Sequence, residues 1–133
     1  MERTRISSGT EWESRVGYSR AVRTGPHVHV SGTTATDDDG EIVHEGDAYN
    51  QTLRAITNVR TALERADASL EDVVRTRLFV TDIERWEAVG DAHAEAFEEI
   101  RPATSMVEVN QLVDPELLVE IEATAIVTDD IEP

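Results

Sequence analysis

Residues 117–127 carry an alternation of apolar and polar side chains that strongly constrains how this chain can fold. The apolar set is Val119, Ile121, Ala123 and Ala125, and the opposite set is Glu120, Glu122 and Thr124. Successive side chains of an extended segment point to opposite faces of a sheet. The segment therefore predicts a strand with one buried face, and we expect that face to be covered by helices.

Other segments predict the remaining elements by their period and their turn residues. Gly25-Pro26 separates two short runs of strand character and indicates a hairpin. Apolar residues at helical spacing predict a helix from a cap at Asp47 to Ala66. Asp82 can cap a second helix, which Pro102 must end. The expected strands span residues 18–24, 27–32, 73–81, 105–110 and 117–127, and the second helix spans 84–100 with a stripe of Trp86, Val89, His93, Phe97 and Ile100.

This order of elements predicts an α+β fold, a mixed sheet with two helices packed on one face. No repeat or linker divides the 133 residues, so we expect a single domain over 1–133. Residues 1–15 are expected to form an N-terminal extension and residues 128–133 an acidic tail.

The charge of the chain excludes several classes of function. Twelve basic residues, all of them arginine, stand against 28 acidic ones, which gives a formal net charge of -16. The electrostatic field of such an acidic chain repels nucleic acid and anionic membranes. The absence of lysine excludes Schiff-base chemistry on a lysine. Acidic excess without lysine suggests adaptation to a salt-rich cytoplasm, where ions screen the repulsion between carboxylates; an ordinary acidic protein is the alternative.

Cysteine and long apolar segments are also absent from the sequence. Disulfides, thiolate nucleophiles and cysteine-bound zinc are therefore excluded. The polar N-terminal segment supports neither a signal peptide nor a membrane span. We expect a cytoplasmic protein with no membrane partner.

The face of the sheet opposite the helices is predicted to mix charge with apolar surface. His27, His29 and Ser31 share this face with Arg75 and Arg77. By the same parity Phe79, Val73 and Ile126 belong to it. A fully solvated face is one interpretation. A cleft between subunits, in which paired charges hold a small polar ligand, is the other.

Few residues carry a chemical signal of their own. Glu120 is a carboxylate within an apolar strand, so it must be paired, hydrogen-bonded or functional; pairing with Arg75 or Arg77 would explain it equally well. His27 and His29 have a spacing that metal sites use, but no third ligand is implied, and we predict no metal. His93 is interpreted as a packing residue.

Four segments of the chain carry a resemblance to a known family: Gly17-Tyr18-Ser19-Arg20-Ala21-Val22, Val30-Ser31-Gly32-Thr33, residues 101–109 (RPATSMVEV) and residues 119–123 (VEIEA). Together they resemble the Rid superfamily, also called the YjgF family or the L-PSP endoribonuclease family. The likeness extends from about Val16 to Val127, and its C-terminal block is the most specific part.

The resemblance implies a chorismate-mutase-like homotrimer with ligand clefts between subunits and no cofactor. Active members hydrolyse enamines and imines, and a glutamate matching Glu120 handles the attacking water. An arginine of the family holds the substrate carboxylate, but Thr104 stands at that position here. The candidate substrate-binding residues are Ser31, Gly32, Thr104, Tyr18 and Arg101. Ser31 and Gly32 match the family, whereas Tyr18 is displaced, because Ser19 stands where active members have a tyrosine.

Three functions are compatible with this sequence. The first is a divergent member of the family that binds a small polar metabolite such as an enamine or imine, or binds and hydrolyses it. In this function Arg20, Arg23 or Arg101 would replace the lost arginine. The second is a noncatalytic trimer that binds a metabolite or a partner. RNA cleavage or inhibition of translation is the third, and the acidic charge disfavours it.

Overall fold

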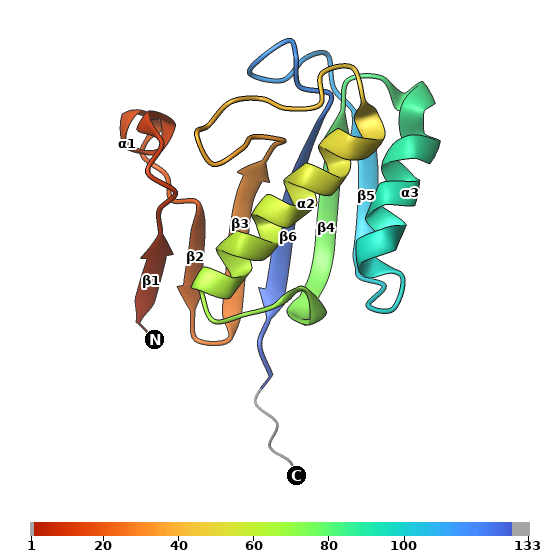
Figure 1. Ribbon diagram of the computed structural model, residues 1–133. Helices are drawn as coiled ribbons and strands as arrows, with labels where there is room; N and C mark the ends of the chain where they lie inside the picture. Colours follow the sequence, from red (N-terminus) through yellow and green to blue (C-terminus); the bar gives the residue numbers. More distant parts are fainter. Residues whose placement is uncertain (1, 129–133) are drawn as a thin grey trace.

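The computed structural model describes residues 2–128 and shows one six-stranded sheet with helices on one of its faces (Figure 1). The strands lie in the order β1-β2-β3-β6-β4-β5. Neighbouring strands are antiparallel except β4 and β5, which are parallel. The predicted mixed α+β architecture is confirmed. The strands are β1 (Arg3–Ile6), β2 (Ala21–Thr24), β3 (His27–Thr33), β4 (Val73–Val80), β5 (Ala103–Glu108) and β6 (Val119–Ile126).

Helices α2 (Ala48–Arg65) and α3 (Trp86–Phe97) lie side by side over the sheet. Asp47 caps α2 as predicted, because its carboxylate accepts a hydrogen bond from the backbone N–H of Asn50 at 3.0 Å. A shorter helix, α1 (Glu11–Val16), precedes β2, and two 3-10 turns, η1 (Leu70–Asp72) and η2 (Ile83–Arg85), flank β4.

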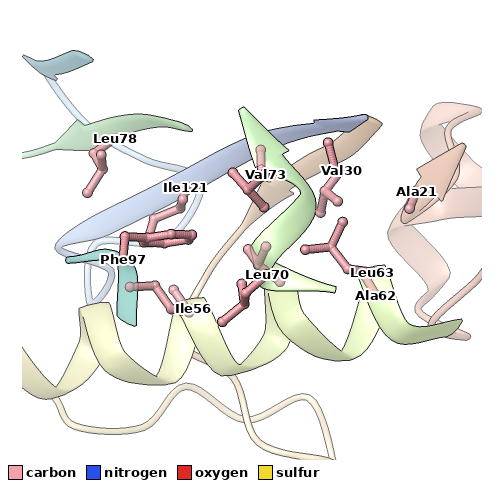
Figure 2. Packing of buried hydrophobic residues seen from close by; sticks show 14 of the residues in the cluster. Ala21, Val30, Ile56, Ala62, Leu63, Leu70, Val73, Leu78, Phe97 and Ile121 are labelled. Atoms are coloured by element: carbon pink, nitrogen blue, oxygen red, sulfur yellow. The ribbon is translucent and has the colours of Figure 1, made fainter. Parts of the chain in front are cut away.

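The hydrophobic core fills the layer between the sheet and the two long helices. Leu63 and Ile56 of α2 approach the sheet residues Val30 and Ile121, and Phe97 of α3 closes the other end (Figure 2). The odd-numbered residues of β6 are buried and the even-numbered ones are partly exposed. The parity predicted for this strand is therefore confirmed, and it places Glu120 and Glu122 on the open face.

Residues 1–15, expected as an extension, add a strand to the sheet. β1 pairs with β2 from Arg3 opposite Thr24 to Ile6 opposite Ala21. Only Ile6 of this strand is buried. An edge strand held mainly by backbone hydrogen bonds needs no apolar alternation, which is why the sequence pattern did not predict it.

The prediction that Val73 shares the open face is wrong. A register shift between Val73 and Arg75, where β4 pairs with β6, turns Val73 into the core and leaves Val74 43% exposed. Such a bulge reverses the parity of the residues before it. From Arg75 onward the predicted alternation holds.

The second predicted helix is shorter than residues 84–100. Its first residues form η2, and Asp82 caps that turn by accepting from the N–H of Glu84 at 3.0 Å, whereas α3 itself begins after Arg85 without a side-chain cap. Trp86 then lies at the start of α3 and is 56% exposed, so it does not join the buried stripe as expected. Val89 and Phe97 of that stripe are buried.

Candidate functional site

The open face of the sheet carries the charged residues that its parity predicted. A depression of about 250 Å³ lies on it. Arg77 pairs with Glu122 through Nε and Oε1 at 3.2 Å, and both side chains are substantially exposed. Of the two explanations for Glu120, direct pairing with Arg75 or Arg77 is therefore not the one observed. The residues lining the depression are Val22, His29, Val30, Ser31, Arg75, Arg77, Glu122, Ala123 and Thr124.

Glu120 lies beside Gly32, on the strand next to it. A Cβ atom placed on Gly32 would lie 2.8 Å from Cδ of Glu120 and would overlap the carboxylate. The register of β3 against β6 shifts between Val30 and Thr33, and this irregularity contains Gly32. The missing side chain therefore creates the space in which the carboxylate lies.

The environment of Glu120 favours the neutral acid. Burial raises the pKa of its carboxyl, the negative charge of Glu122 raises it further, and the nearby guanidinium of Arg20 opposes both effects without cancelling them. A carboxyl whose pKa lies above the ordinary value can accept and return a proton closer to neutral pH. This is the property expected of a general acid–base group.

Arg20 connects the residues around Glu120. Its Nη2 donates to the backbone carbonyl of Gly32 at 2.7 Å, and its guanidinium carbon lies 5.8 Å from the ring centre of Tyr18. Its buried Nε has no hydrogen-bond partner within residues 2–128. From the sequence, Arg20 is one of three candidates to replace the family's arginine, and the structure places it beside Glu120.

Ser31 stabilises the same region. Its hydroxyl donates to the carbonyl of Ser19 at 2.7 Å, and its backbone N–H donates to the carbonyl of Arg20 at 3.0 Å. The hydroxyl of Thr33 donates to the carbonyl of Ser31 at 2.7 Å. The hydrogen of the Ser31 hydroxyl is thus occupied, and its oxygen can serve a ligand only as an acceptor.

Thr104 and Arg101 lie apart from this cluster within one protomer. Thr104 belongs to β5, and β4 separates that strand from the β6 strand of Glu120. Arg101 is exposed in the turn before β5, has a φ of 55° and donates through Nε to the carbonyl of Glu98 at 3.0 Å. The structure therefore groups Tyr18, Ser31, Gly32 and Glu120 around Arg20 and leaves two predicted residues elsewhere.

The histidines of β3 do not build a metal site with their neighbours. His27 and His29 are exposed on the strand. Among the residues that the structure describes, no group of three or more histidine, cysteine, aspartate or glutamate side chains is placed to hold an ion.

Comparison with known proteins shows the family to which the chain belongs. The family described as Endoribonuclease L-PSP matches residues 9–127, which is most of the chain. The chain belongs to this family. It is the family called YjgF or Rid above, and the match contains all the predicted site residues.

Relatives of this Rid-family chain cover nearly its whole length. It is 36% identical to the 3-aminoacrylate deaminase RutC of Acinetobacter baylyi over 108 residues, 81% of this chain and 85% of the relative. A YjgF/YER057c/UK114-family structure from Mycobacterium tuberculosis is 56% identical, with a TM-score of 0.86 over 95% of this chain and 100% of that one.

A structure of TdcF from E. coli with bound serine is also similar, at 25% identity and a TM-score of 0.80. The match covers 93% of this chain and 94% of that one. In this Rid-family chain, none of the helices within residues 2–128 combines the length and the apolar character that crossing a bilayer requires.

Proposed function

We propose that this protein hydrolyses a small polar enamine or imine in a cleft between the subunits of a homotrimer. The observation that carries the proposal is the half-buried carboxylate of Glu120, placed beside Gly32 and shifted toward the neutral acid. A single carboxyl of this kind is sufficient for the reaction, because a C=N bond is already electrophilic.

Glu120 acts on the water that attacks the substrate. The carboxylate accepts a proton from water while the water oxygen bonds to the imine carbon, and it passes this proton to the nitrogen, which has received the π electrons of the C=N bond. In the resulting carbinolamine Glu120 accepts the hydroxyl proton, the C–N bond breaks, and ammonia leaves as the carbonyl forms. Glu120 returns its proton to the departing nitrogen, so the group ends in its initial state.

The neighbours of Glu120 supply binding groups for a small molecule. Arg20 offers a cation and a buried Nε donor beside the carboxylate. Tyr18 is 38% exposed and can cover the ligand with its ring. Ser31 offers an acceptor from its hydroxyl oxygen. No cofactor is required for hydrolysis, because water is the only second reactant.

The proposal includes a homotrimer because one protomer does not complete the site. Thr104 lies on β5 at the edge of the sheet, away from Glu120. The open face also exposes apolar side chains, among them Val74 at 43% and Val107 at 46%. Contact between this surface and a second copy would bury them, and we propose that the assembly also brings the exposed Thr104 on the edge strand of one subunit toward Glu120 of another.

Two relatives support the choice of substrate. RutC is named as a 3-aminoacrylate deaminase, and the TdcF structure holds serine. Both names point to small amino-acid-like molecules. We propose the same class of ligand for the present chain, and we propose that it acts in the cytoplasm.

A noncatalytic trimer that binds a metabolite is the second candidate. The observation in its favour is Thr104, which has no charge with which to clamp a carboxylate. RNA cleavage is less favoured, because a net charge of -16 opposes binding of a polyanion.

Hydrolysis of imines generated in the assay separates the candidates. An amine oxidase generates imines that lack a carboxylate, and an amino-acid oxidase generates imino acids. Semicarbazide then traps the imine that has not been hydrolysed. We expect wild-type protein to speed the loss of at least one imine, and Glu120→Gln to lower the rate by about 10²- to 10⁴-fold. Glu64→Gln is the matched control, since it removes an exposed carboxylate of α2, on the other side of the sheet, and it should retain most of the activity. Equal rates for wild type and Glu120→Gln would favour the noncatalytic candidate.

A further inference from the structure

A chain of hydrogen bonds runs from α3 across β4 to the exposed residue Thr104 of β5. Nε2 of His93 lies 2.9 Å from the hydroxyl oxygen of Thr76, and that oxygen lies 2.8 Å from the hydroxyl oxygen of Thr104. The hydroxyl of Thr104 also lies 3.1 Å from the carbonyl oxygen of Pro102. Thr76, in the middle, is only 1% exposed. The chain thus connects a half-buried imidazole to a surface residue.

The number of hydrogens available to these hydrogen bonds determines which group donates in each. A carbonyl oxygen only accepts, so the single hydroxyl hydrogen of Thr104 goes to Pro102. The bond between the two threonines then needs the hydrogen of Thr76. Thr76 has none left for His93, so Nε2 of His93 must itself carry a hydrogen and donate it. All three bonds form together only in this direction.

His93 has the properties that this direction requires. Burial lowers the pKa of its imidazole, so the ring is neutral at neutral pH. It lies against the ring of Phe97, with 4.6 Å between ring centres. A neutral ring with hydrogen on Nε2 supplies the donor at the start of the chain.

We infer that Thr104 presents a fixed hydrogen-bond acceptor to the ligand and selects a ligand group that donates, such as an amide, an amine or a hydroxyl, over a carboxylate. The hydroxyl oxygen of Thr104 has one lone pair engaged by Thr76 and a second lone pair that no hydrogen bond within residues 2–128 occupies, while its hydrogen is held by Pro102. A carboxylate, which only accepts, would meet that second lone pair at the exposed residue. This inference rests on the proposed ligand cleft and adds the chemical class of its ligand, with His93 as a positioning residue.

The test compares two probes that differ at one group. Pyruvamide carries an amide where pyruvate carries a carboxylate, and titration calorimetry or ligand-observed NMR gives both dissociation constants. We expect wild-type protein to bind pyruvamide about three- to tenfold more tightly, the worth of one hydrogen bond. Thr104→Val keeps the shape of the side chain and should remove the preference. Thr104→Arg should reverse it, because guanidinium binds carboxylate.

The role of His93 needs a measurement that packing alone would not change. The ¹⁵N chemical shifts of the imidazole should report hydrogen on Nε2. His93→Gln keeps a donor near that position and should keep the preference for pyruvamide. His93→Leu fills the space without a donor. The hydrogen bond between Thr76 and Thr104 can then run in either direction, and the preference for pyruvamide should fall. Hydrogen on Nδ1 alone, or equal preference in both variants, would overturn the positioning role.

Failure of this inference can be told apart from failure of the proposed function. Preference for pyruvate, no preference, or no binding of either probe by wild-type protein would overturn the inference. Hydrolysis that depends on Glu120 would in those cases still support the proposed function. A clear preference for pyruvamide without any hydrolysis would support the inference and leave the noncatalytic candidate.

Discussion

Gly32 and the carboxylate of Glu120 occupy adjoining space on neighbouring strands, so that any side chain on Gly32 would displace the carboxylate. The obstacle is spatial, because the end of Glu120 is what a Cβ atom would meet. A flexible side chain can swing away from such a contact at small cost. A substitution at Gly32 is therefore expected to disturb the site without disturbing the fold.

Gly32→Ala should lose hydrolysis while keeping most of its stability. We expect the rate to fall at least tenfold, because the carboxylate moves from its place, and the free energy of unfolding to change by less than about 1 kcal/mol. Rate assays and urea unfolding are the measurements. Gly90→Ala is the control, since nothing lies near a Cβ atom there and alanine favours the α3 helix. Full activity in Gly32→Ala would show that the position of Glu120 is not critical.

Glu120→Gln should be inactive yet no less stable at neutral pH. The folded-state pKa of Glu120 is raised, so ionisation opposes folding, and stability falls as pH rises from the unfolded value through the folded one. Glutamine stays neutral and removes that loss. Melting curves of both proteins from pH 4 to pH 8 should separate as pH rises, with the variant higher. In wild type the hydrolysis rate should rise with pH above the ordinary range of glutamate. Curves that stay parallel would contradict the raised pKa.

Glu13 should stabilise the fold above the acid range. It is buried, and burial raises the pKa of its carboxyl, but hydrogen bonds from Ser8 and the charge of Arg20 outweigh this effect and hold the pKa below the usual value. A lowered pKa stabilises the folded state above the unfolded value, about 4.3, and the contribution is lost as pH falls through the folded value. Glu13→Gln should cost about 1–3 kcal/mol at pH 7 and progressively less below pH 4. A constant difference across that range would mean that charge is not involved.

Salt should raise the melting temperature. A formal net charge of -16 on 133 residues produces repulsion between carboxylates, and the screening length falls from about 10 Å at 0.1 M to about 3 Å at 1 M salt. Calorimetric melting in dilute and molar potassium chloride is the measurement. A melting temperature that stays flat or falls would argue for the ordinary acidic protein.

The assembled protein should have about three times the 14.7 kDa mass of one chain in light scattering. If Glu120 of one subunit meets Thr104 of the next, Thr104→Val should also lower hydrolysis, and mixed trimers of Glu120→Gln and Thr104→Val should regain part of the activity lost in each. Unmixed samples at the same total concentration are the control. A monomer over micromolar concentrations would refute the shared cleft.

Elements with a local physical cause could be predicted from the sequence. The parity of β6 follows from alternation, the start of α2 from the cap at Asp47, and the hairpin from Gly25-Pro26. Each depends on residues next to one another in the chain. The resemblance to a family then gave Glu120 and Gly32 as site residues, although not the contact between them.

What the tertiary structure decided depends on residues distant in the sequence. β1 exists because β2 offers its backbone groups, and the bulge after Val73 reverses the face of Val73 and Val74. Gly32 meets Glu120 only because β3 pairs with β6, and His93 reaches Thr76 of β4 only because α3 lies over the sheet. The sequence alone determines which side chains each strand can expose. Strand order and register, which arise from pairing across the whole sheet, decide which of them meet.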